Sequence, residues 1–389
     1  MPQRIIIPLL VLYLLGMSSC TRTLWTGGKL TEITLEEWIP VEFTDNLLFL
    51  EVSINQRPYR FMLDTGAPNV IDQRIAEELG LRVVSSNYVT DSQRQRRRQD
   101  IVELGELNFA GQTILNSRAV VADLSHFACT NIDGLIGSNV LHHFDLEIDY
   151  QRPAVRFFRN RDTTELKADF PLEFGFEMNA QKTPKINAHV GGEERRFSFD
   201  TGSASSITMG GIKPDELDGV LKSRWIYGQT SRGIFGARTD TTHFALLDEF
   251  AFTDYDLRFS RVYATMRSRA SNLIGNRFWK NYRVVISWAH RRAFLREAKP
   301  DMEELASTQI YLTYADQHVK LKAIGSEFLE KYAYLAPEML VLSMNGRSLE
   351  YIDETDFCNL PHEDRYELVV VDREGELHTL DLRDEIVVF

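Results

Sequence analysis

The sequence predicts a mainly β protein, with two similar β-rich lobes followed by a smaller α+β domain. Three observations support this prediction. Short segments with the apolar and polar alternation of strands recur along most of the 389 residues. The tripeptide Asp-Thr-Gly occurs twice, at residues 64–66 and 200–202, each time directly after a short apolar segment. After residue 309 the pattern changes to strands mixed with helical segments.

The two Asp-Thr-Gly copies belong to an internal repeat. Residues 60–67 (RFMLDTGA) align with residues 196–203 (RFSFDTGS) at an offset of 136 residues. Each half then contains an apolar-apolar-Gly element, which ends at Gly137 in the first half and at Gly275 in the second. Two carboxylates at equivalent positions of similar halves are expected to meet, and such a pair can share a proton and activate a water.

The first lobe is expected to span residues 38–160. Its predicted elements, in order, are strands 47–54 and 59–63 forming a hairpin, a helix over 72–79 that ends at Gly80, strands 101–104 and 119–121, a short helix over 139–144, and a closing strand over 146–150.

The second lobe, residues 171–297, is expected to repeat this order. Strands 185–190 and 195–199 flank a Gly-Gly turn, a short helix begins at residue 277, and a closing strand covers residues 282–288. Residues 298–306 are charged and are interpreted as a linker to the third domain.

The third domain is expected over residues 309–389. It contains strands near 319–324, 339–344 and 366–371, with a hairpin turn at 373–375. Residues 341–347 (VLSMNGR) are the part that most resembles a PDZ domain, a fold in which a peptide adds as a strand to a sheet edge. Glu338-Met339 stands where that family has Gly-Asp, and no Gly-Leu-Gly-Phe loop is visible. Peptide binding and a structural docking role therefore both stay open.

Residues 1–20 have the pattern of an export signal. A short basic start precedes an apolar run at residues 5–15, which is too short for a membrane span, and small residues lead to Cys20. This ending resembles a bacterial lipoprotein signal, in which the cysteine is lipidated. The resemblance implies a lipoprotein anchored in the membrane of the bacterial cell envelope and facing the periplasm, with soluble secretion as the alternative.

Charge and cysteine content exclude some functions. A net charge of −12 disfavours binding to a phosphate backbone, so no nucleic-acid partner is expected. Cys129 and Cys358 lie in different predicted domains, and we expect two buried free thiols. The histidines lack metal-ligand spacing, and the pair at 142–143 is expected on a helix surface, so neither a metal nor another cofactor is predicted.

Taken together, the repeated segments make residues 40–296 resemble retropepsin-like aspartic proteases, with two lobes fused in one chain as in pepsin-type enzymes. The resemblance implies two closed β-barrel lobes related by a pseudo-twofold axis, in a chain that acts as a monomer. It also implies that Asp64 and Asp200 are catalytic, and that the supporting residues are Thr65, Gly66, Gly137, Thr201, Gly202, Ser203 and Gly275.

In this family the chemistry needs one proton on the acid pair. The ionised carboxylate takes a proton from a water while the other acid donates to the carbonyl of the peptide bond. Ser203 can donate a hydrogen bond to Asp200, whereas Ala67 at the equivalent position cannot. We therefore expect Asp200 to be the more acidic partner and Asp64 to hold the proton more often.

Two segments are candidates for flaps that close over a substrate. In the second lobe this is residues 225–236, where Trp225, Tyr227, Gly228 and Gly233 are the expected substrate contacts. In the first lobe the segment is residues 88–100. It begins at Tyr88, lacks glycine, and contains four arginines, Arg94, Arg96, Arg97 and Arg98. The arginines either belong to a solvated surface loop or select acidic substrate residues or a lipid head group.

The sequence therefore predicts an aspartic endopeptidase that acts on peptides or proteins. The alternative is a catalytically inactive envelope protein that binds peptides or scaffolds partners, with a partner site on the PDZ-like domain.

Overall fold

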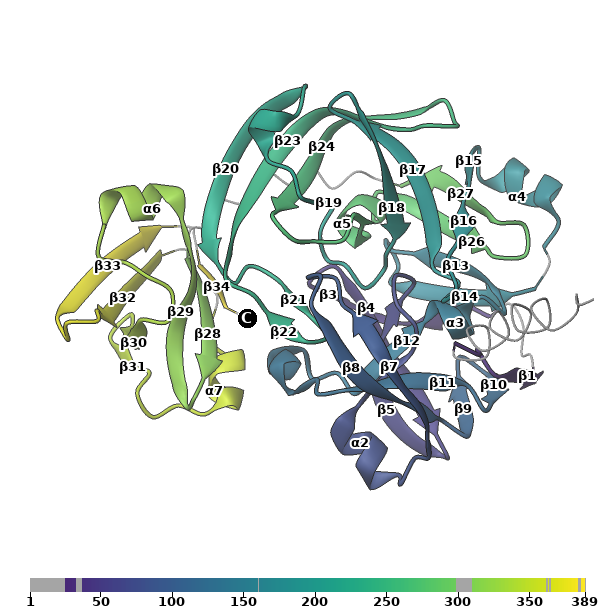
Figure 1. Ribbon diagram of the computed structural model, residues 1–389, viewed down its shortest axis with the longest axis horizontal. Helices are drawn as coiled ribbons and strands as arrows, with labels where there is room; N and C mark the ends of the chain where they lie inside the picture. Colours follow the sequence, from purple (N-terminus) through teal and green to yellow (C-terminus); the bar gives the residue numbers. More distant parts are fainter. Residues whose placement is uncertain are drawn as a thin grey trace, which may run out of the picture.

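The computed structural model describes residues 25–32, 37–159, 161–298, 310–361, 363, 365–383 and 386–388. Most of these residues lie in strands, which confirms the prediction of a mainly β protein (Figure 1). The predicted signal with Cys20, and residues 299–306 of the linker predicted over 298–306, fall outside the described residues. Within the described part, no helix has the length and apolar character needed to cross a membrane.

The first repeat, residues 38–160, forms most of an 11-stranded sheet. The turn of its first hairpin has positive φ at Asn55 and Gln56, which suits a two-residue hairpin turn. Its elements, with the preceding strand β1 (Lys29–Glu32), are β2 (Ile39–Pro40), β3 (Glu42–Thr44), β4 (Leu47–Ile54), β5 (Arg57–Asp64), β6 (Val70–Asp72), α2 (Gln73–Glu78), β7 (Val83–Thr90), β8 (Arg96–Glu103), β9 (Glu106–Phe109), β10 (Gln112–Leu115), β11 (Arg118–Ala122), the 3-10 helix η1 (Ser125–Thr130), β12 (Gly134–Gly137), α3 (Ser138–Leu141), β13 (Asp145–Asp149) and β14 (Ala154–Phe158).

The second repeat, residues 171–297, follows the short helix α4 (Thr163–Asp169). Its first hairpin turns at Gly191 and Gly192, both with positive φ. The elements are β15 (Leu172–Gly175), β16 (Glu177–Met178), β17 (Pro184–Val190), β18 (Glu193–Phe199), β19 (Ile207–Gly210), the 3-10 helix η2 (Pro214–Glu216), β20 (Val220–Gly228), β21 (Arg232–Gly233), β22 (Gly236–Ala237), β23 (Asp240–Phe252), β24 (Leu257–Arg267), β25 (Leu273–Ile274), α5 (Asn276–Trp279), β26 (Tyr282–Ser287) and β27 (Arg292–Glu297).

A six-stranded sheet joins the two repeats, in the order β15-β27-β26-β13-β14-β2. The closing strands β13 and β26 pair antiparallel at its centre, with Asp145 opposite Ser287. Glu147 in the middle of β13 is fully buried and forms ion pairs with Arg156 and Arg283, one from each repeat. One continuous hydrophobic core extends through both repeats.

The C-terminal segment, residues 310–388, has a hydrophobic core of its own and lies beside β20 (Figure 1). Strand β29 pairs antiparallel with β20, so that this segment extends the sheet of the second repeat. Its elements are β28 (Ile310–Ala315), β29 (His318–Gly325), α6 (Ser326–Lys331), β30 (Leu340–Met344), β31 (Arg347–Ser348), α7 (Glu354–Cys358), β32 (Arg365–Val371), β33 (Leu377–Arg383) and β34 (Ile386–Val388).

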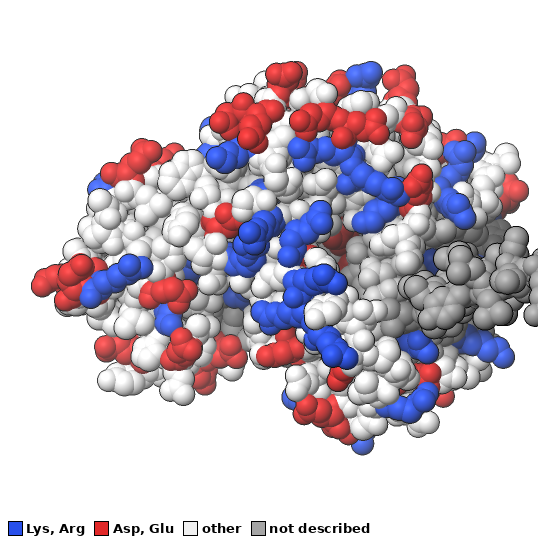
Figure 2. Space-filling model, in the orientation of Figure 1, with Lys and Arg blue, Asp and Glu red and all other residues white. Residues whose placement is uncertain are grey.

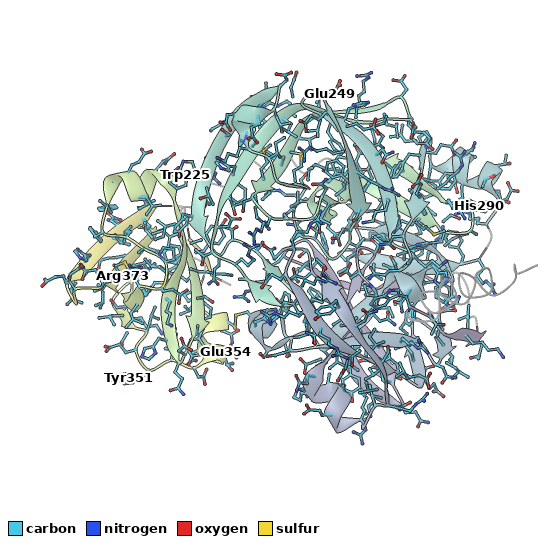
Figure 3. All side chains as sticks on the ribbon, viewed as in Figure 1. Trp225, Glu249, His290, Tyr351, Glu354 and Arg373 are labelled. Atoms are coloured by element: carbon cyan, nitrogen blue, oxygen red, sulfur yellow. A yellow bond between two sulfur atoms is a disulfide. The ribbon has the colours of Figure 1, made fainter. Side chains whose placement is uncertain are left out.

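A disulfide between Cys129 and Cys358 links η1 of the first repeat to α7 of the C-terminal segment. In Figure 3 the bond between the two sulfur atoms lies close to Glu354, the first residue of α7. The expectation of two buried free thiols is therefore wrong. It rested on the assumption that thiols in different domains stay apart, whereas η1 and α7 pack against each other.

Candidate active site

The structure brings the two Asp-Thr-Gly loops into direct contact. Strands β5 and β18 end at or just before the aspartates, and each loop packs against the carboxyl group of the other. A Cβ atom on Gly66 would lie 2.4 Å from Cγ of Asp200, and one on Gly202 would lie 2.4 Å from Cγ of Asp64. Only glycine permits so close an approach, and each aspartate influences the pKa of the other.

The two threonines lock the loops together in a symmetric way. Thr65 Oγ1 donates to the carbonyl of Phe199 at 2.8 Å and accepts from the backbone N–H of Thr201 at 3.1 Å. Thr201 Oγ1 donates to the carbonyl of Leu63 at 2.8 Å and accepts from the N–H of Thr65 at 3.0 Å. Both threonines are fully buried, so these four bonds hold the relative position of the aspartates without competition from water.

The carboxyl groups are buried but differ in their hydrogen bonds. Asp64 Oδ1 accepts from the backbone N–H groups of Gly66 at 2.7 Å and Ala67 at 3.0 Å. Asp200 Oδ1 accepts from Gly202 at 2.9 Å. Burial raises the pKa of Asp64, and burial together with the charge of Asp64 raises the pKa of Asp200 well above its ordinary value.

This order of the two pKa values, with that of Asp200 the higher, is opposite to the order expected from the sequence. In the described structure Ser203 Oγ makes no hydrogen bond to Asp200, and the Ser203 N–H points to the backbone carbonyl of Asp200 at 3.3 Å. Ala67 instead supplies a second backbone donor to Asp64. Asp64 is therefore the partner better suited to carry the negative charge, and Asp200 the partner that holds the proton.

The apolar-apolar-Gly elements lie directly beside the aspartate loops. Gly137 is opposite Asp64 in the parallel pairing of β12 with β5, and Ile274, next to Gly275, is opposite Phe199 in the pairing of β25 with β18. A Cβ on Gly137 would lie 2.2 Å from the backbone of Pro68, and one on Gly275 would lie 2.3 Å from the backbone of Ser205. A side chain at either glycine would displace the loop.

The sequence reasoning missed the polar residues that follow these glycines. Ser138 Oγ donates to the carbonyl of Thr65 at 2.5 Å, and Asn276 Nδ2 donates to the carbonyl of Thr201 at 2.6 Å. Tyr150 Oη in turn donates to Asn276 Oδ1 at 2.8 Å. The sequence contains a signal for this role, because Ser138 and Asn276 each follow the repeated glycine directly.

The arginine-rich segment of the first repeat is a hairpin of β7 and β8, whose turn rests on the second repeat. Gln93 Nε2 donates to Ser231 Oγ at 2.6 Å, and the Ser271 N–H donates to the carbonyl of Ser92 at 2.9 Å. Tyr88 is 58% exposed, and the guanidinium of Arg96 stacks on its ring. The segment is therefore an ordered hairpin, and substrate contact by Tyr88 stays a prediction.

The arginines of this hairpin have different surroundings. Arg97 donates to the carbonyl of Phe235 at 3.0 Å, and its guanidinium lies over the ring of the same residue. Arg94, at the turn, donates to the carbonyl of Ala270 at 3.4 Å. On the face of the molecule drawn in Figure 2, Lys and Arg side chains gather in the middle, between the two repeats.

The predicted flap of the second repeat divides into two parts. Trp225, Tyr227 and Gly228 lie in β20, at the junction with the C-terminal segment (Figure 3), where Tyr227 pairs with Ile324 and Gly228 with Ala323 of β29. Residues 229–238 continue toward the first repeat, and Gly233 packs against Asp91. Substrate contact by these four residues stays a prediction, with Gly233 the one placed beside the β7–β8 turn.

The site offers acid–base chemistry. In the described ranges no three or more His, Cys, Asp or Glu side chains are placed to hold a metal ion. His142 and His143, expected on a helix surface, are half-buried after α3, and burial lowers the pKa of His142 to about 4. A buried pair of acids that shares one proton can serve as general base and general acid together.

Comparisons with known proteins found one family model and similar solved structures. Residues 50–140, which contain Asp64, match the family model described as aspartyl protease. Among solved structures the chain is similar to a retropepsin-like aspartic protease from Rickettsia conorii, with 19% identity over 33% of this chain and 97% of that chain, and a TM-score of 0.25. No curated protein matches the chain. The family-model match supports an aspartyl-protease relationship for the first repeat.

Proposed function

We propose that the chain is an aspartic endopeptidase whose acid pair is Asp64 and Asp200. The observation that carries the proposal is the contact between the two Asp-Thr-Gly loops, in which each glycine packs on the carboxyl group of the opposite aspartate. The family-model match over residues 50–140 supports the same class of enzyme.

In the proposed mechanism Asp64 is the base and Asp200 the acid. Asp64, with two backbone donors, carries the charge and takes a proton from a water placed between the carboxyls. Asp200 gives its proton to the carbonyl oxygen of the peptide bond as the water attacks. The threonine bonds keep the two groups in place during this exchange.

The test is to offer the chain without residues 1–20 a mixed peptide library from pH 4 to 8, alongside Asp64→Asn and Asp200→Asn variants. We expect cleavage by the wild-type protein and a loss of at least about a thousandfold in both variants, since Asp64→Asn removes the general base and Asp200→Asn removes the general acid. Absence of cleavage at every pH would favour the alternative function, a peptide-binding or scaffolding protein. Activity that survives in one variant would show that the aspartates do not act as a pair.

We further propose that the enzyme works in the bacterial cell envelope as a monomer, anchored by a lipidated Cys20. The disulfide between Cys129 and Cys358 supports an oxidising compartment outside the cytoplasm. Radiolabelled palmitate should be incorporated into the wild-type chain and not into a Cys20→Ser variant. A single chain that supplies both aspartates needs no partner subunit.

For the PDZ-like segment we propose a docking role. Its strand β29 is paired on one edge with β20, and β28 is paired with β34, so two sheet edges that a peptide strand would use are already occupied. Residues 310–388 therefore extend and stabilise the sheet of the second repeat. A peptide or protein partner would have to displace one of these strands.

A further inference from the structure

The short hairpin of β21 and β22 carries two large apolar residues at its tip. Gly233 pairs with Gly236 across the hairpin. The two residues between them, Ile234 and Phe235, therefore form its turn. Two-residue turns ordinarily contain small or polar residues, because they face water. None of residues 229–238 is exposed, so this tip is inserted into the protein and is not presented to solvent.

The hairpin tip packs into an apolar cluster of the first repeat. Phe235 is 6% exposed and is a buried member of this cluster, and Ile234 packs against it. The other buried members all come from the first repeat, and they are Phe49, Met62, Val70, Val89, Val120, Ala122, Leu124, Ile132 and Leu135. Removal of this apolar surface from water stabilises the inserted position of the tip.

The apolar cluster lies directly beside Asp64. Met62 precedes Asp64 by two residues in β5, so the two side chains point to the same face of the strand. Leu135 of β12 lies opposite Met62 in the parallel pairing of the two strands. Ala67 packs against the cluster and donates its N–H to Asp64 Oδ1. An apolar side chain of a substrate bound at the acid pair would therefore meet the place that Phe235 occupies.

The first repeat also holds the hairpin through polar contacts. Arg97 of β8 donates to the carbonyl of Phe235 at 3.0 Å. Gln95, in the turn before β8, donates through Nε2 to the carbonyl of Gly236 at 3.3 Å. Both bonds end on backbone carbonyls at the tip of the hairpin, so they fix the position of the tip in the cluster.

The C-terminal segment contacts the same hairpin (Figure 1), which lies between this segment and the first repeat. The Gln229 N–H donates to the carbonyl of Lys322 in β29 at 2.9 Å. The guanidinium of Arg232 donates to Thr313 Oγ1 in β28 at 3.4 Å and to the carbonyl of His126 in η1. Arg232 therefore connects the hairpin to the C-terminal segment and to the first repeat at once.

We propose that the β21–β22 hairpin is an internal plug, whose tip occupies a subsite beside Asp64 and has to be displaced by a large apolar side chain of the substrate. The C-terminal segment anchors this autoinhibitory contact through Arg232. The inference rests on the proposed endopeptidase function. Such a plug lowers the apparent affinity for substrate by the fraction of molecules in which the subsite is open.

The first test removes the plug. Blocked octapeptides that differ only by Phe or Ala at one position, scanned along the peptide, are offered to the wild-type chain and to Phe235→Ala. At one position KM for the Phe peptide should be about 10-fold lower in Phe235→Ala, with little change in kcat, because the internal competitor is gone. The Ala peptide, which does not fill the subsite, should show a smaller change.

The direction of the change in KM separates a plug from a wall of the subsite. If Phe235 were a wall that contacts the substrate, its removal would raise KM. A KM for every Phe peptide that is unchanged or raised in Phe235→Ala, with thermal unfolding showing a folded protein, would overturn the plug.

Arg232→Gln weakens the anchor and leaves the apolar cluster intact, so it keeps the proposal testable if Phe235→Ala does not fold. It should lower KM for the same Phe peptide by about two- to tenfold, the effect of one lost hydrogen bond. Arg258→Gln is the matched control for the loss of one positive charge, because Arg258 pairs with Glu249 on the surface. It should leave KM unchanged, and an equally unchanged KM in Arg232→Gln would refute the anchor.

A covalent lock tests whether the hairpin has to move. A Cβ on Gly233 would lie 3.2 Å from Cβ of Asp91, close to the separation of about 3.5–4.5 Å in a disulfide. Asp91→Cys with Gly233→Cys should lose at least about 10-fold in activity when oxidised and recover it in dithiothreitol. The wild-type chain, treated alike, controls for reduction of its own disulfide. Equal activity of the cross-linked and reduced forms would overturn the plug.

A binding measurement separates failure of the plug from failure of the proposed enzymatic function. If the wild-type chain cleaves none of the peptides, the endopeptidase proposal fails, and the same peptides are titrated by calorimetry into the wild-type, Phe235→Ala and Arg232→Gln chains. Tighter binding of a Phe peptide to the variants than to wild type would still support the plug. Equal binding to all three chains, or binding to none, would refute it.

Discussion

At the scale of single residues, the two aspartates are distinguished by one backbone donor. Asp64 accepts from Gly66 and Ala67, whereas Asp200 accepts from Gly202 alone. The internal repeat predicted that the aspartates meet, because identical tripeptides at equivalent positions of two similar halves are related by one pseudo-twofold axis. It could not predict which acid is stronger, since the sequence shows that Ser203 carries a hydroxyl but not where the hydroxyl points.

The raised pKa of Asp200 makes stability depend on pH. The folded protein keeps this proton at pH values where the unfolded chain, with an ordinary Asp pKa of about 3.9, has lost it. The stabilising contribution is full below that pH and is lost as pH rises through the raised pKa. Asp200→Asn should therefore gain stability relative to wild type from pH 4 to 7, by about 1.4 kcal/mol per unit of raised pKa.

Thermal unfolding of both proteins at several pH values measures this difference in stability as a difference in Tm. A difference between Asp200→Asn and wild type that is constant or shrinks as pH rises would contradict the assignment of the proton to Asp200.

The threonine bonds lead to a second prediction at this scale. Thr65→Val keeps the volume but leaves the Thr201 N–H and the Phe199 carbonyl without partners in a buried site. We expect a loss of about 2–6 kcal/mol in the free energy of unfolding, about 1–3 kcal/mol for each of the two unsatisfied groups. Urea titration measures it. Thr65→Ser, which retains the hydroxyl, should lose much less; an equal loss would show that the methyl group matters and the hydrogen bonds do not.

At the scale of elements, short strands were predicted whether or not their burial alternates, since β13 is buried throughout and was expected over 146–150. Strand β17 alternates between buried and more exposed residues and was expected over 185–190. The long strands β23 and β24 were missed. Strand β8 was expected only over its last residues, 101–103, because its first residues, Arg96, Arg97 and Arg98, were assigned to a flap segment or a solvated surface loop.

The central sheet gives a prediction at the element scale. Glu147 in β13 is fully buried between Arg156 and Arg283. Glu147→Gln leaves these two arginines, and Arg161 at 3.9 Å, without their buried carboxylate and should lower the free energy of unfolding by about 3–5 kcal/mol. Glu249→Gln breaks the exposed pair with Arg258 and should cost no more than about 1 kcal/mol. Similar losses in the two variants, measured by urea unfolding, would show that burial of the charge is unimportant.

At the scale of the whole molecule, the sequence predicted the order of the segments and missed how they attach to each other. Pairing of β20 with β29 joins segments that are far apart in the chain, and neither strand shows its partner in its own pattern. The same holds for Cys129 and Cys358, which are 229 residues apart. Contacts of this kind depend on three-dimensional packing, so local spacing carries no signal for them.

The disulfide connects the C-terminal segment to a part of the first repeat that contacts residues 229–238 of the second repeat. Cys129 lies in η1, and the neighbouring His126 contacts the carbonyl of Gly233 at 3.0 Å, two residues before Phe235. A cross-link that closes so long a loop restricts the unfolded chain, so Cys129→Ser with Cys358→Ser should cost about 2–5 kcal/mol. A lower Tm for the double variant than for the oxidised wild type, with the two converging after addition of dithiothreitol, is the expected result. Equal Tm values under oxidising conditions would show that the contacts of β20 with β29 alone hold the C-terminal segment in place.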